Sequence, residues 1–330
     1  MKILVSGGTG YIGSHTCVEL LAVGHDVVIA DNLCNSQKNV VDKIETISGI
    51  RPDFFELDVT DEVNTEELFK KYSFDGVIHF AGLKAVGESV NKPLEYYYNN
   101  LVSTIVLSKL CIKYNVPRFV FSSSATVYGE NKPPFSEDMK LNPTTNPYGE
   151  TKAMSERILI DTSKVNASFG VSLLRYFNPV GAHKSGLIGE LPNGIPNNLM
   201  PFITQVAKGK REQVSVFGND YDTVDGTGVR DYIHVVDLAK GHVAALEKLG
   251  NEVEIFNLGT GKGTSVLELI HAFENVNGIK VPYEIAPRRA GDIAEFYADV
   301  EKAERELGWK TMLTIEDMVR DSWNFEKSNE

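Results

Sequence analysis

The sequence has little cysteine, no long hydrophobic run and no excess of positive charge. Its three cysteines, Cys17, Cys34 and Cys111, are odd in number and lack the spacing of metal ligands. Such sparse use of cysteine is typical of a reducing compartment, so we expect a cytoplasmic protein without disulfides and without a metal site. No apolar stretch has the length of a membrane span or a signal peptide, which argues against a membrane protein.

The charge balance excludes two classes of partner. The chain has 33 Lys and Arg residues against 45 Asp and Glu residues, and its formal net charge is −12. Nucleic acids and anionic membranes are bound by clustered Lys and Arg, so neither is an expected partner. The apolar share of 42% is ordinary for a globular protein. A length of 330 residues exceeds what one hydrophobic core usually supports, so two domains are expected.

The first half of the chain alternates between strands and helices. Short β-rich runs are separated by segments with helical spacing, an order that predicts a parallel sheet joined by right-handed crossovers. The fold class we expect is α/β, a Rossmann-type doubly wound parallel sheet with a second, smaller mixed α/β lobe. The expected strands are Lys2–Val5, His25–Ala30, Phe54–Leu57, Gly76–Phe80, Arg118–Ser122 and Val171–Tyr176.

The composition changes after Tyr176, because Gly, Pro and Asn become frequent between Asn178 and Pro201. We therefore expect one domain over residues 1–176 and a smaller, loop-rich domain over residues 177–330. Some later segments, roughly residues 231–260, are expected to pack back on the first domain. The last residues, 326–330, are expected to fray.

A glycine-rich loop joins the first strand to the first helix. Gly7, Gly10 and Gly13 lie where the backbone must turn and where the amides of a helix N-terminus can approach a pyrophosphate. Asp31 ends the next strand, where a carboxylate can accept hydrogen bonds from both hydroxyls of a ribose. The same carboxylate repels a 2′-phosphate, so the loop and Asp31 together predict NAD rather than NADP. The alternative is an ordinary strand–turn–helix with a capping aspartate.

A tyrosine and a lysine one helical turn apart form the second functional pattern. Tyr148 and Lys152 are spaced i, i+4 at the start of a helix, where Pro147 suits the first turn and Asn146 the N-cap. A phenol titrates near ~10, so a base acting near neutrality needs a pKa lower by about three units, or roughly 4 kcal/mol. A lysine ammonium and the positive nicotinamide of an oxidised cofactor are expected to supply this shift. Ser124 follows a strand at the carboxyl edge of the sheet, where its hydroxyl can hydrogen-bond the reacting oxygen.

A second tyrosine–lysine pair with the same spacing, Tyr128 and Lys132, is rejected. Pro133 and Pro134 follow it directly and break any helix there. For the serine, the alternative to a catalytic role is a polar turn over Ser122–Ser124.

Together these residues resemble the extended short-chain dehydrogenase/reductase family, and within it the UDP-glucose 4-epimerases. The resemblance rests on six strings that span nearly the whole chain. They are SGGTGYIGSH (Ser6–His15), FAGLKAVGES (Phe80–Ser89), SSSATVYG (Ser122–Gly129), NPYGETK (Asn146–Lys152), YFNPVGAH (Tyr176–His183) and GTGVRDYIHV (Gly226–Val235).

The resemblance implies NAD as the cofactor. Asp58 and Val59 would contact the adenine, Lys84 would reach a ribose, and Phe177 would touch the end of the cofactor. The full set of implied cofactor residues is Gly7, Gly10, Tyr11, Ile12, Gly13, Asp31, Asn32, Asn35, Ser36, Asp58, Val59, Phe80, Ala81, Gly82, Lys84, Asn99, Ser122, Tyr148, Lys152 and Phe177.

The resemblance also implies a UDP-hexose substrate. Arg230 and Arg289 would bind the diphosphate, a role that suits the planar guanidinium. The segment Ser215–Phe217 would frame the uracil, and Phe296 would limit the sugar pocket and disfavour N-acetylated sugars. The implied substrate residues are Lys84, Ser124, Tyr148, Asn178, Asn197, Asn198, Leu199, Ser215, Val216, Phe217, Arg230, Arg289, Asp292 and Phe296.

The activity that the resemblance implies is reversible epimerisation at C4 of UDP-glucose and UDP-galactose, a step of galactose metabolism. Tyr148 would take the proton of the 4-hydroxyl while a hydride leaves C4 for tightly bound NAD. The 4-keto sugar would then turn about its link to the diphosphate and receive the hydride on its other face. A long helix within Asn91–Tyr114 and the helix that starts near Tyr148 would form a homodimer interface.

Three other functions are weighed against this one. A nucleotide-sugar 4,6-dehydratase needs carboxylates directly after the serine, where this chain has Ala125 and Thr126. A UDP-glucuronate epimerase stays open, because it differs only in accommodating a carboxylate at C6. A non-catalytic NAD-binding sensor or scaffold is disfavoured, because Tyr148, Lys152 and Ser124 are all retained.

Overall fold

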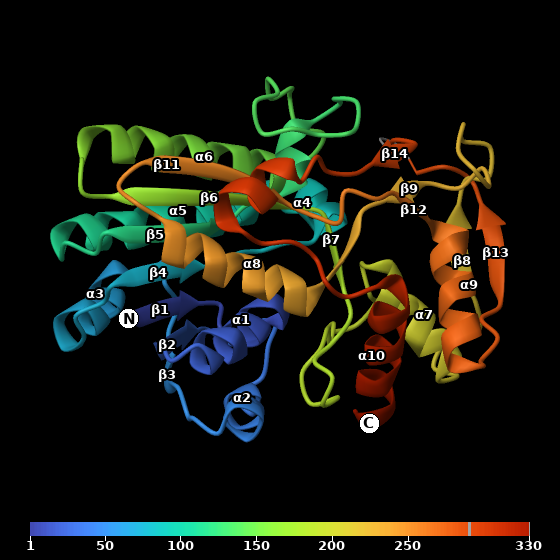
Figure 1. Ribbon diagram of the computed structural model, residues 1–330, viewed down its shortest axis with the longest axis horizontal. Coiled ribbons are helices and arrows are strands. Elements are labelled where there is room, and N and C mark those ends of the chain that lie inside the picture. The colour runs from blue at the N-terminus through green and yellow to red at the C-terminus, as the bar shows by residue number, and fades with distance from the viewer. Residues whose placement is uncertain (290–291, 330) are drawn as a thin grey trace.

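A seven-stranded parallel sheet forms the larger part of the protein (Figure 1). The computed structural model describes residues 1–289 and 292–329. The strand order is β11-β6-β5-β4-β1-β2-β3, and every neighbouring pair is parallel. This confirms the expected Rossmann-type α/β fold. The strands are β1 (Lys2–Ser6), β2 (Asp26–Asp31), β3 (Asp53–Glu56), β4 (Gly76–His79), β5 (Arg118–Ser122), β6 (Gly170–Tyr176) and β11 (Val253–Leu258).

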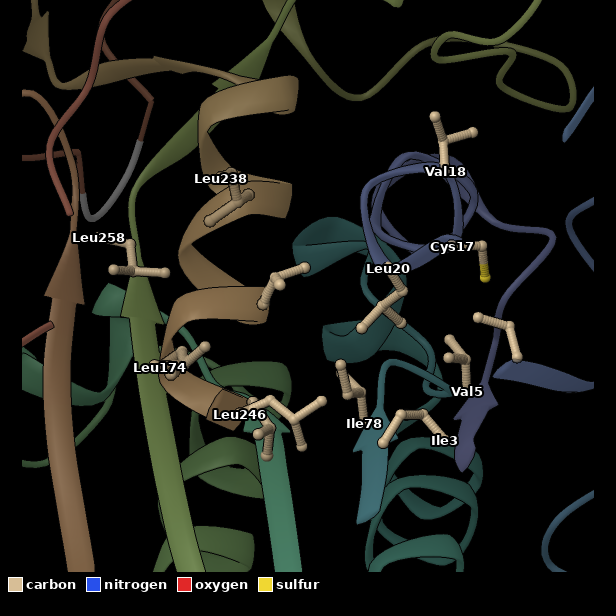
Figure 2. Close-up of a cluster of buried hydrophobic side chains, with 14 of the residues drawn as sticks. Ile3, Val5, Cys17, Val18, Leu20, Ile78, Leu174, Leu238, Leu246 and Leu258 are labelled. Carbon is tan, nitrogen blue, oxygen red and sulfur yellow. The ribbon is translucent and has the colours of Figure 1, made fainter. Parts of the chain in front are cut away.

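Helices cover both faces of the sheet (Figure 1). Because successive side chains of a strand point to opposite faces, Ile3 and Val5 of β1 belong to one core cluster and Leu4 to another. Figure 2 shows part of the first cluster, in which Leu20 from one helix lies near Ile78 and Leu238 from another lies toward Leu258. This face carries α1 (Tyr11–Ala22), α2 (Val40–Ser48) and α8 (Val235–Lys248), and the other carries α3 (Glu62–Lys71), α5 (Pro93–Lys113) and α6 (Pro147–Val165).

Most of the remaining elements lie around a separate core cluster, on the right in Figure 1. Val216, Phe273 and Val319 are fully buried in it. Short strands and three helices contribute, while a short helix and a 3₁₀ turn connect elements of the large sheet and a π-helical turn packs on its core. These elements are β7 (Asn178–Val180), β8 (Val214–Phe217), β9 (Val229–Arg230), β10 (Tyr232–His234), β12 (Thr264–Ser265), β13 (Tyr283–Ala286), β14 (Glu295–Phe296), α7 (Leu199–Ala207), α9 (Val266–Asn277), α10 (Ile315–Ser328), α4 (Val86–Asn91), η1 (Ala125–Tyr128) and η2 (Ala303–Leu307).

The expectation of a frayed end is wrong for most of the segment concerned. Helix α10 continues to Ser328, and the Glu326 carboxylate is buried against the ammonium groups of Lys208 and Lys210. Glu330 lies outside the described residues. Over the described ranges, the helices are too short or too polar to cross a lipid bilayer.

Candidate active site

The glycine loop lies between the carboxyl end of β1 and the start of α1. Gly7 has a left-handed φ of 73°, and a Cβ there would lie 2.7 Å from the amide nitrogen of Ala81. A Cβ on Gly13 would collide with the carbonyl oxygen of Gly7. Gly10 is the N-cap of α1 and places no side chain over the helix amides. The loop therefore forms a bare cradle with open N–H groups, which fits a pyrophosphate.

Asp31 ends β2, and its carboxylate reaches back to the glycine loop. The side chain accepts hydrogen bonds from the Thr9 amide at 3.1 Å, the Leu33 amide at 2.9 Å and the Ser36 hydroxyl at 3.1 Å. A carboxylate offers about four acceptor positions, so one stays for a ribose hydroxyl. The predicted Asp31 and Ser36 are thus brought together beside the loop.

The predicted adenine-side residues lie on the loops after β2 and β3. The side-chain amide of Asn32 donates to the Asp58 carboxylate at 3.1 Å and so joins the two loops. Asn35 and Asp58 are exposed, whereas Val59 is buried in the core cluster beneath α3. Val59 can therefore offer a ligand only its main-chain atoms.

The chain leaving β4 runs beside the glycine loop. The amides of Phe80 and Ala81 both donate to the Ser6 carbonyl, at 2.9 and 3.1 Å. This contact lies between β1 and β4, where the strand order reverses and where such sheets bind their ligands. Tyr11 and Ile12 begin the adjoining helix, and the Tyr11 hydroxyl donates to the Gly181 carbonyl at 2.7 Å.

Asn100 connects this loop to the helix that carries Tyr148, and it was missed in the sequence. Its Oδ1 accepts from the Leu83 amide at 2.8 Å and from the Asn99 side chain at 3.0 Å. Its Nδ2 donates to the Leu83 carbonyl at 3.0 Å and to the Thr151 hydroxyl at 2.9 Å. The predicted Gly82 packs against the same side chain. The sequence signal that could have identified it is a polar asparagine on the inward face of a long helix.

Lys84 and Asn198, predicted to bind different ligand groups, meet on Glu190. Lys84 Nζ lies 3.0 Å from Glu190 Oε1, and Asn198 Nδ2 donates to the same oxygen at 2.7 Å. Glu190 lies in the long loop before α7, where no local pattern identified it. The carboxylate thus joins the loop after β4 to the segment expected to hold the substrate.

Tyr148 lies in the first turn of α6, as predicted. Pro147 is the first helical residue, and the Asn146 side chain accepts from the Gly149 amide as the N-cap. Burial raises the pKa of the Tyr148 hydroxyl, and a hydrogen bond from Ser124 partly offsets this effect. The rejected Tyr128 lies instead in η1, where its hydroxyl donates to Asn257.

Lys152 lies one turn further along α6, with its side chain buried. Its Nζ donates to the Ser122 carbonyl at 2.6 Å and lies 5.9 Å from the centre of the Tyr148 ring. Burial lowers the pKa of Lys152 to about 8, while the nearby Glu156 carboxylate opposes this effect. In this structure the ammonium is therefore held by β5, and the raised pKa keeps the Tyr148 phenol protonated near neutral pH.

Ser124 is the N-cap of η1, directly beyond β5. Its Oγ accepts hydrogen bonds from Thr126, and its hydroxyl lowers the pKa of Tyr148. Ser122, at the end of β5, shares a 2.5 Å hydrogen bond with the Tyr176 hydroxyl. The predicted catalytic residues are thus brought together at the carboxyl edge of the sheet.

A buried ion pair lies behind the catalytic residues and was not anticipated. Arg175 Nη2 and Nε donate to the two oxygens of the Glu156 carboxylate, at 2.7 and 2.9 Å. The Ser123 hydroxyl donates to the same carboxylate at 2.5 Å. Glu156 follows Lys152 by one helical turn, so the pair fixes the helix that carries both predicted catalytic side chains.

The two arginines predicted to bind the diphosphate lie in the smaller region, apart from the catalytic edge of the sheet. Arg230 Nη1 donates to the carbonyls of Val229 and Ile293, at 2.8 and 3.0 Å, and its Nη2 lies 3.4 Å from the Asp292 carboxylate. The Asp292 amide donates to the Arg289 carbonyl at 3.3 Å. Asp292 therefore links Arg230 of β9 to the chain near Arg289.

The predicted uracil residues lie on β8 beside this segment. The Arg289 guanidinium lies 3.8 Å from the centre of the Phe217 ring. Ser215 Oγ donates to Glu284 at 3.2 Å, and Val216 is fully buried in the core of the smaller region. Phe217 therefore offers a ring face, whereas Val216 can offer a ligand only main-chain atoms.

The residues predicted near the sugar lie between the two regions. Phe296 packs with its ring centre 5.1 Å from that of Phe177 and 4.7 Å from that of Phe135. The main-chain amide of Asn178 donates to the Asp231 carbonyl at 3.0 Å. Asn197 is exposed ahead of α7, and Leu199 starts that helix.

A model of the NAD dependent epimerase/dehydratase family matches residues 3–259. A UDP-glucose 4-epimerase of Haemophilus influenzae is 56% identical over 332 residues, which cover 100% of this chain and 98% of that protein.

Solved structures agree with this similarity. A UDP-glucose 4-epimerase from Bifidobacterium longum, in complex with NAD+ and UDP, superposes with a TM-score of 0.95 at 54% identity, covering 100% of this chain and 99% of that one. The enzyme from Stenotrophomonas maltophila, with bound NAD and formylated UDP-arabinopyranose, has a TM-score of 0.97 at 50% identity and covers 99% of this chain and 98% of its own.

Proposed function

The chain belongs to the NAD dependent epimerase/dehydratase family, and we propose that it interconverts UDP-glucose and UDP-galactose by reversible epimerisation at C4 of the hexose. One observation carries the proposal. Tyr148, Ser124 and Lys152 converge at the carboxyl edge of the sheet, the edge that also carries the bare glycine loop. The activity belongs to galactose metabolism, and the substrate is a UDP-hexose.

The residues around the loop fit a tightly held NAD. The amides of Tyr11 and Ile12, at the start of α1, would hold the pyrophosphate, because the N-cap Gly10 places no side chain over them. The remaining acceptor position of Asp31 would take a ribose hydroxyl. When bound, NAD would accept a hydride from C4 and, once reduced, return it, and its oxidised form would place a positive charge beside the phenol.

The side chains of this protein handle the proton. Tyr148 Oη removes the hydrogen of the 4-hydroxyl and later returns it, while Ser124 donates a hydrogen bond to the reacting oxygens. Lys152, anchored to the Ser122 carbonyl, has further N–H donors for a ribose. Burial opposes ionisation of Tyr148, so an additional positive charge at the site is needed before the phenol becomes a base.

The smaller region binds the UDP part of the substrate. Arg230 and Arg289 attract the diphosphate within an otherwise acidic protein, and Asp292 holds Arg230 in place. Phe217 lies against the uracil. Firm binding of UDP, together with looser binding of the hexose, lets the 4-keto sugar turn over and expose its other face.

The residue after Ser124 favours epimerisation over dehydration. Ala125 is buried and apolar, so it supplies no carboxylate for the elimination of water. The choice between a hexose and a uronic acid at C6 is decided by the experiment below.

The experiment is incubation of purified protein with UDP-galactose and no added cofactor, followed by NMR of the anomeric protons. We expect UDP-glucose to accumulate to equilibrium, and UDP-glucuronate to stay unchanged in a parallel sample. Tyr148→Phe should lose at least about 100-fold in turnover, because it removes the acid–base group. The control Tyr283→Phe alters a half-exposed phenol of β13 and should keep full activity. Protein that neither contains nor can be loaded with pyridine nucleotide would refute the proposal.

The chain is proposed to form two domains and to act in the cytoplasm. Residues 1–176 make up the NAD-binding domain, and residues 177–330 the nucleotide-sugar domain. Two later elements, α8 and β11, pack with the first domain. Three free thiols, at Cys17, Cys34 and Cys111, suit a reducing compartment.

A homodimer is proposed from the outer face of α5 and its surroundings. Leu94 is 81% exposed and Tyr98 66% exposed, and Ile105 extends their stripe along the helix. Val86 and Val90 of α4 are also exposed. Apolar side chains gathered in this way are typical of a protein–protein contact. A second copy, with its own α5 and α6, is the proposed occupant.

A further inference from the structure

The hydroxyl of Ser124 is held by one neighbouring residue through two hydrogen bonds. The main-chain amide of Thr126 donates to Ser124 Oγ at 3.2 Å, and the Thr126 hydroxyl donates to the same oxygen at 2.9 Å. A serine hydroxyl has two acceptor positions and one donor hydrogen. Both acceptor positions of Ser124 Oγ are therefore filled from within the protein, and its own hydrogen must go to another group.

Tyr148 is the nearby group to which we assign this hydrogen. Burial raises the pKa of the Tyr148 hydroxyl, and the hydrogen bond from Ser124 lowers it. A donor stabilises the phenolate, whereas an acceptor at the same place would stabilise the neutral phenol. The direction of the Ser124 hydroxyl therefore decides whether it helps or hinders proton removal by Tyr148.

Packing confines the Thr126 side chain in the position that controls Ser124. A Cβ on Gly149 would lie 3.3 Å from Thr126 Oγ1 and 3.4 Å from Thr126 Cβ, so the bare glycine lets the start of α6 approach the η1 turn. The Thr126 carbonyl accepts from the Gly129 amide at 3.2 Å and closes the turn on its other side. The threonine is thus fixed between Ser124 and the helix that carries Tyr148.

We propose that Thr126 is a positioning residue, which fills the acceptor positions of Ser124 Oγ and makes the Ser124 hydroxyl act only as a donor. The receiver is Tyr148 and, during the reaction, the oxygen at C4 of the sugar. This role rests on the proposed function above and adds a residue that does not itself handle the proton. No bond forms or breaks at Thr126, because its effect is to orient one hydrogen.

Three other titratable groups face Tyr148 from the elements packed around it. They are Lys152 on the same helix, Tyr96 on α5 and Tyr176 on β6. Burial raises the pKa of both tyrosines, so they stay neutral in the test below, while burial lowers that of Lys152 to about 8. These groups are the same in all variants, so a difference between variants reports on the Ser124–Thr126 contact.

The test compares Thr126→Val, which keeps the shape and removes the hydroxyl, with Thr126→Ser, which keeps the hydroxyl. The protein is used as purified with its nucleotide, and two quantities are measured. One is the pH profile of kcat with UDP-galactose. The other is the titration of Tyr148 by near-ultraviolet absorbance, with Tyr148→Phe as the blank. Thr126→Ala is a second variant without the hydroxyl, in case valine disturbs folding.

We expect removal of the hydroxyl to raise the apparent pKa of Tyr148 by about 0.5–1 unit, as for the loss of one hydrogen bond. Turnover near neutral pH should fall by about three- to tenfold, with the loss shrinking as the pH rises. Thr126→Ser should behave as the wild type. An unchanged Tyr148 titration, or a loss of kcat that is equal at every pH, would overturn the proposal in favour of a structural role.

A double-mutant cycle gives an independent decision. In a Ser124→Ala background the Thr126 hydroxyl has no partner to orient, so Thr126→Val should cause no further loss. An equal loss in both backgrounds would overturn the proposal. The Tyr148 titration needs no turnover, so it still decides the role of Thr126 if the protein does not act on UDP-galactose and the proposed function fails.

Discussion

Arg175 and Glu156 form a bidentate ion pair inside the protein, with side-chain exposures of 3% and 2%. Removing one partner of such a pair leaves a buried charge uncompensated, which costs about 3–5 kcal/mol. We expect Glu156→Gln to lower the free energy of unfolding by at least about 3 kcal/mol, because its amide cannot neutralise Arg175. Urea unfolding at neutral pH measures this loss.

The control is an exposed pair on the same helix. Asp161 and Lys164 lie 3.0 Å apart with side chains about two-thirds exposed, so Asp161→Asn should cost less than about 1 kcal/mol. An unfolding midpoint for Glu156→Gln equal to that of the control would show that the buried pair contributes no more to stability than the exposed one.

The stability of the nucleotide-free protein should rise with pH through the titration of Lys152. Burial lowers the folded-state pKa to about 8 from the ordinary 10.5. Below pH 8 both states hold the proton, and the buried charge lowers stability. Above it, the unfolded state binds more protons than the folded state, so stability increases with pH up to the unfolded pKa.

The contribution of Lys152 is isolated by comparison with the variant Lys152→Met, because methionine has no ionisable group. The wild type should gain about 2 kcal/mol relative to this variant between about pH 7.5 and about pH 9.5. Urea unfolding at several pH values measures the difference. A constant difference across the range would mean that Lys152 keeps its ordinary pKa in the folded state.

Much of the fold and the core of the site follow from local patterns. The strand and helix runs predicted the large sheet, since each has its own periodicity. The glycine loop and Asp31 are tied to the end of a particular strand. Tyr148 and Lys152 are tied to a capped helix start. Such features depend on residues close together in the chain, which sequence reasoning can evaluate.

The features that were missed depend on contacts between distant segments. Arg175 lies within an apolar strand, and nothing near it in the chain identifies Glu156 as its partner. Asn100 and Glu190 likewise act by joining segments that are far apart in the chain. The direction of the Lys152 ammonium, toward the Ser122 carbonyl, depends on how α6 packs on β5. Tertiary packing, rather than propensity, decides these contacts.

The proposed dimer contact predicts that one surface substitution changes the molecular mass. Leu94→Glu places a charge on the exposed apolar stripe of α5 and should convert a dimer into a monomer at micromolar concentration. Light scattering after size exclusion measures the mass. Met312→Glu is the matched control, because Met312 is 70% exposed outside the stripe and should leave the dimer intact. A monomeric wild type would remove the proposed contact.

The bulk of Phe296 predicts a preference among sugars. Its ring is half-buried against Phe135 and Phe177, next to the space assigned to the hexose. Phe296→Ala should open room for an N-acetyl group and raise kcat/KM for UDP-N-acetylgalactosamine, relative to UDP-galactose, by about tenfold, which equals roughly 1.4 kcal/mol. Phe55→Ala removes a half-buried ring on β3, remote from the sugar, and should leave the ratio unchanged. Both variants lose an aromatic contact. If the loss of packing alone changed the preference, the ratio of the two kcat/KM values would therefore change in both variants. A wild type that already turns over both sugars equally would show that Phe296 does not limit the pocket.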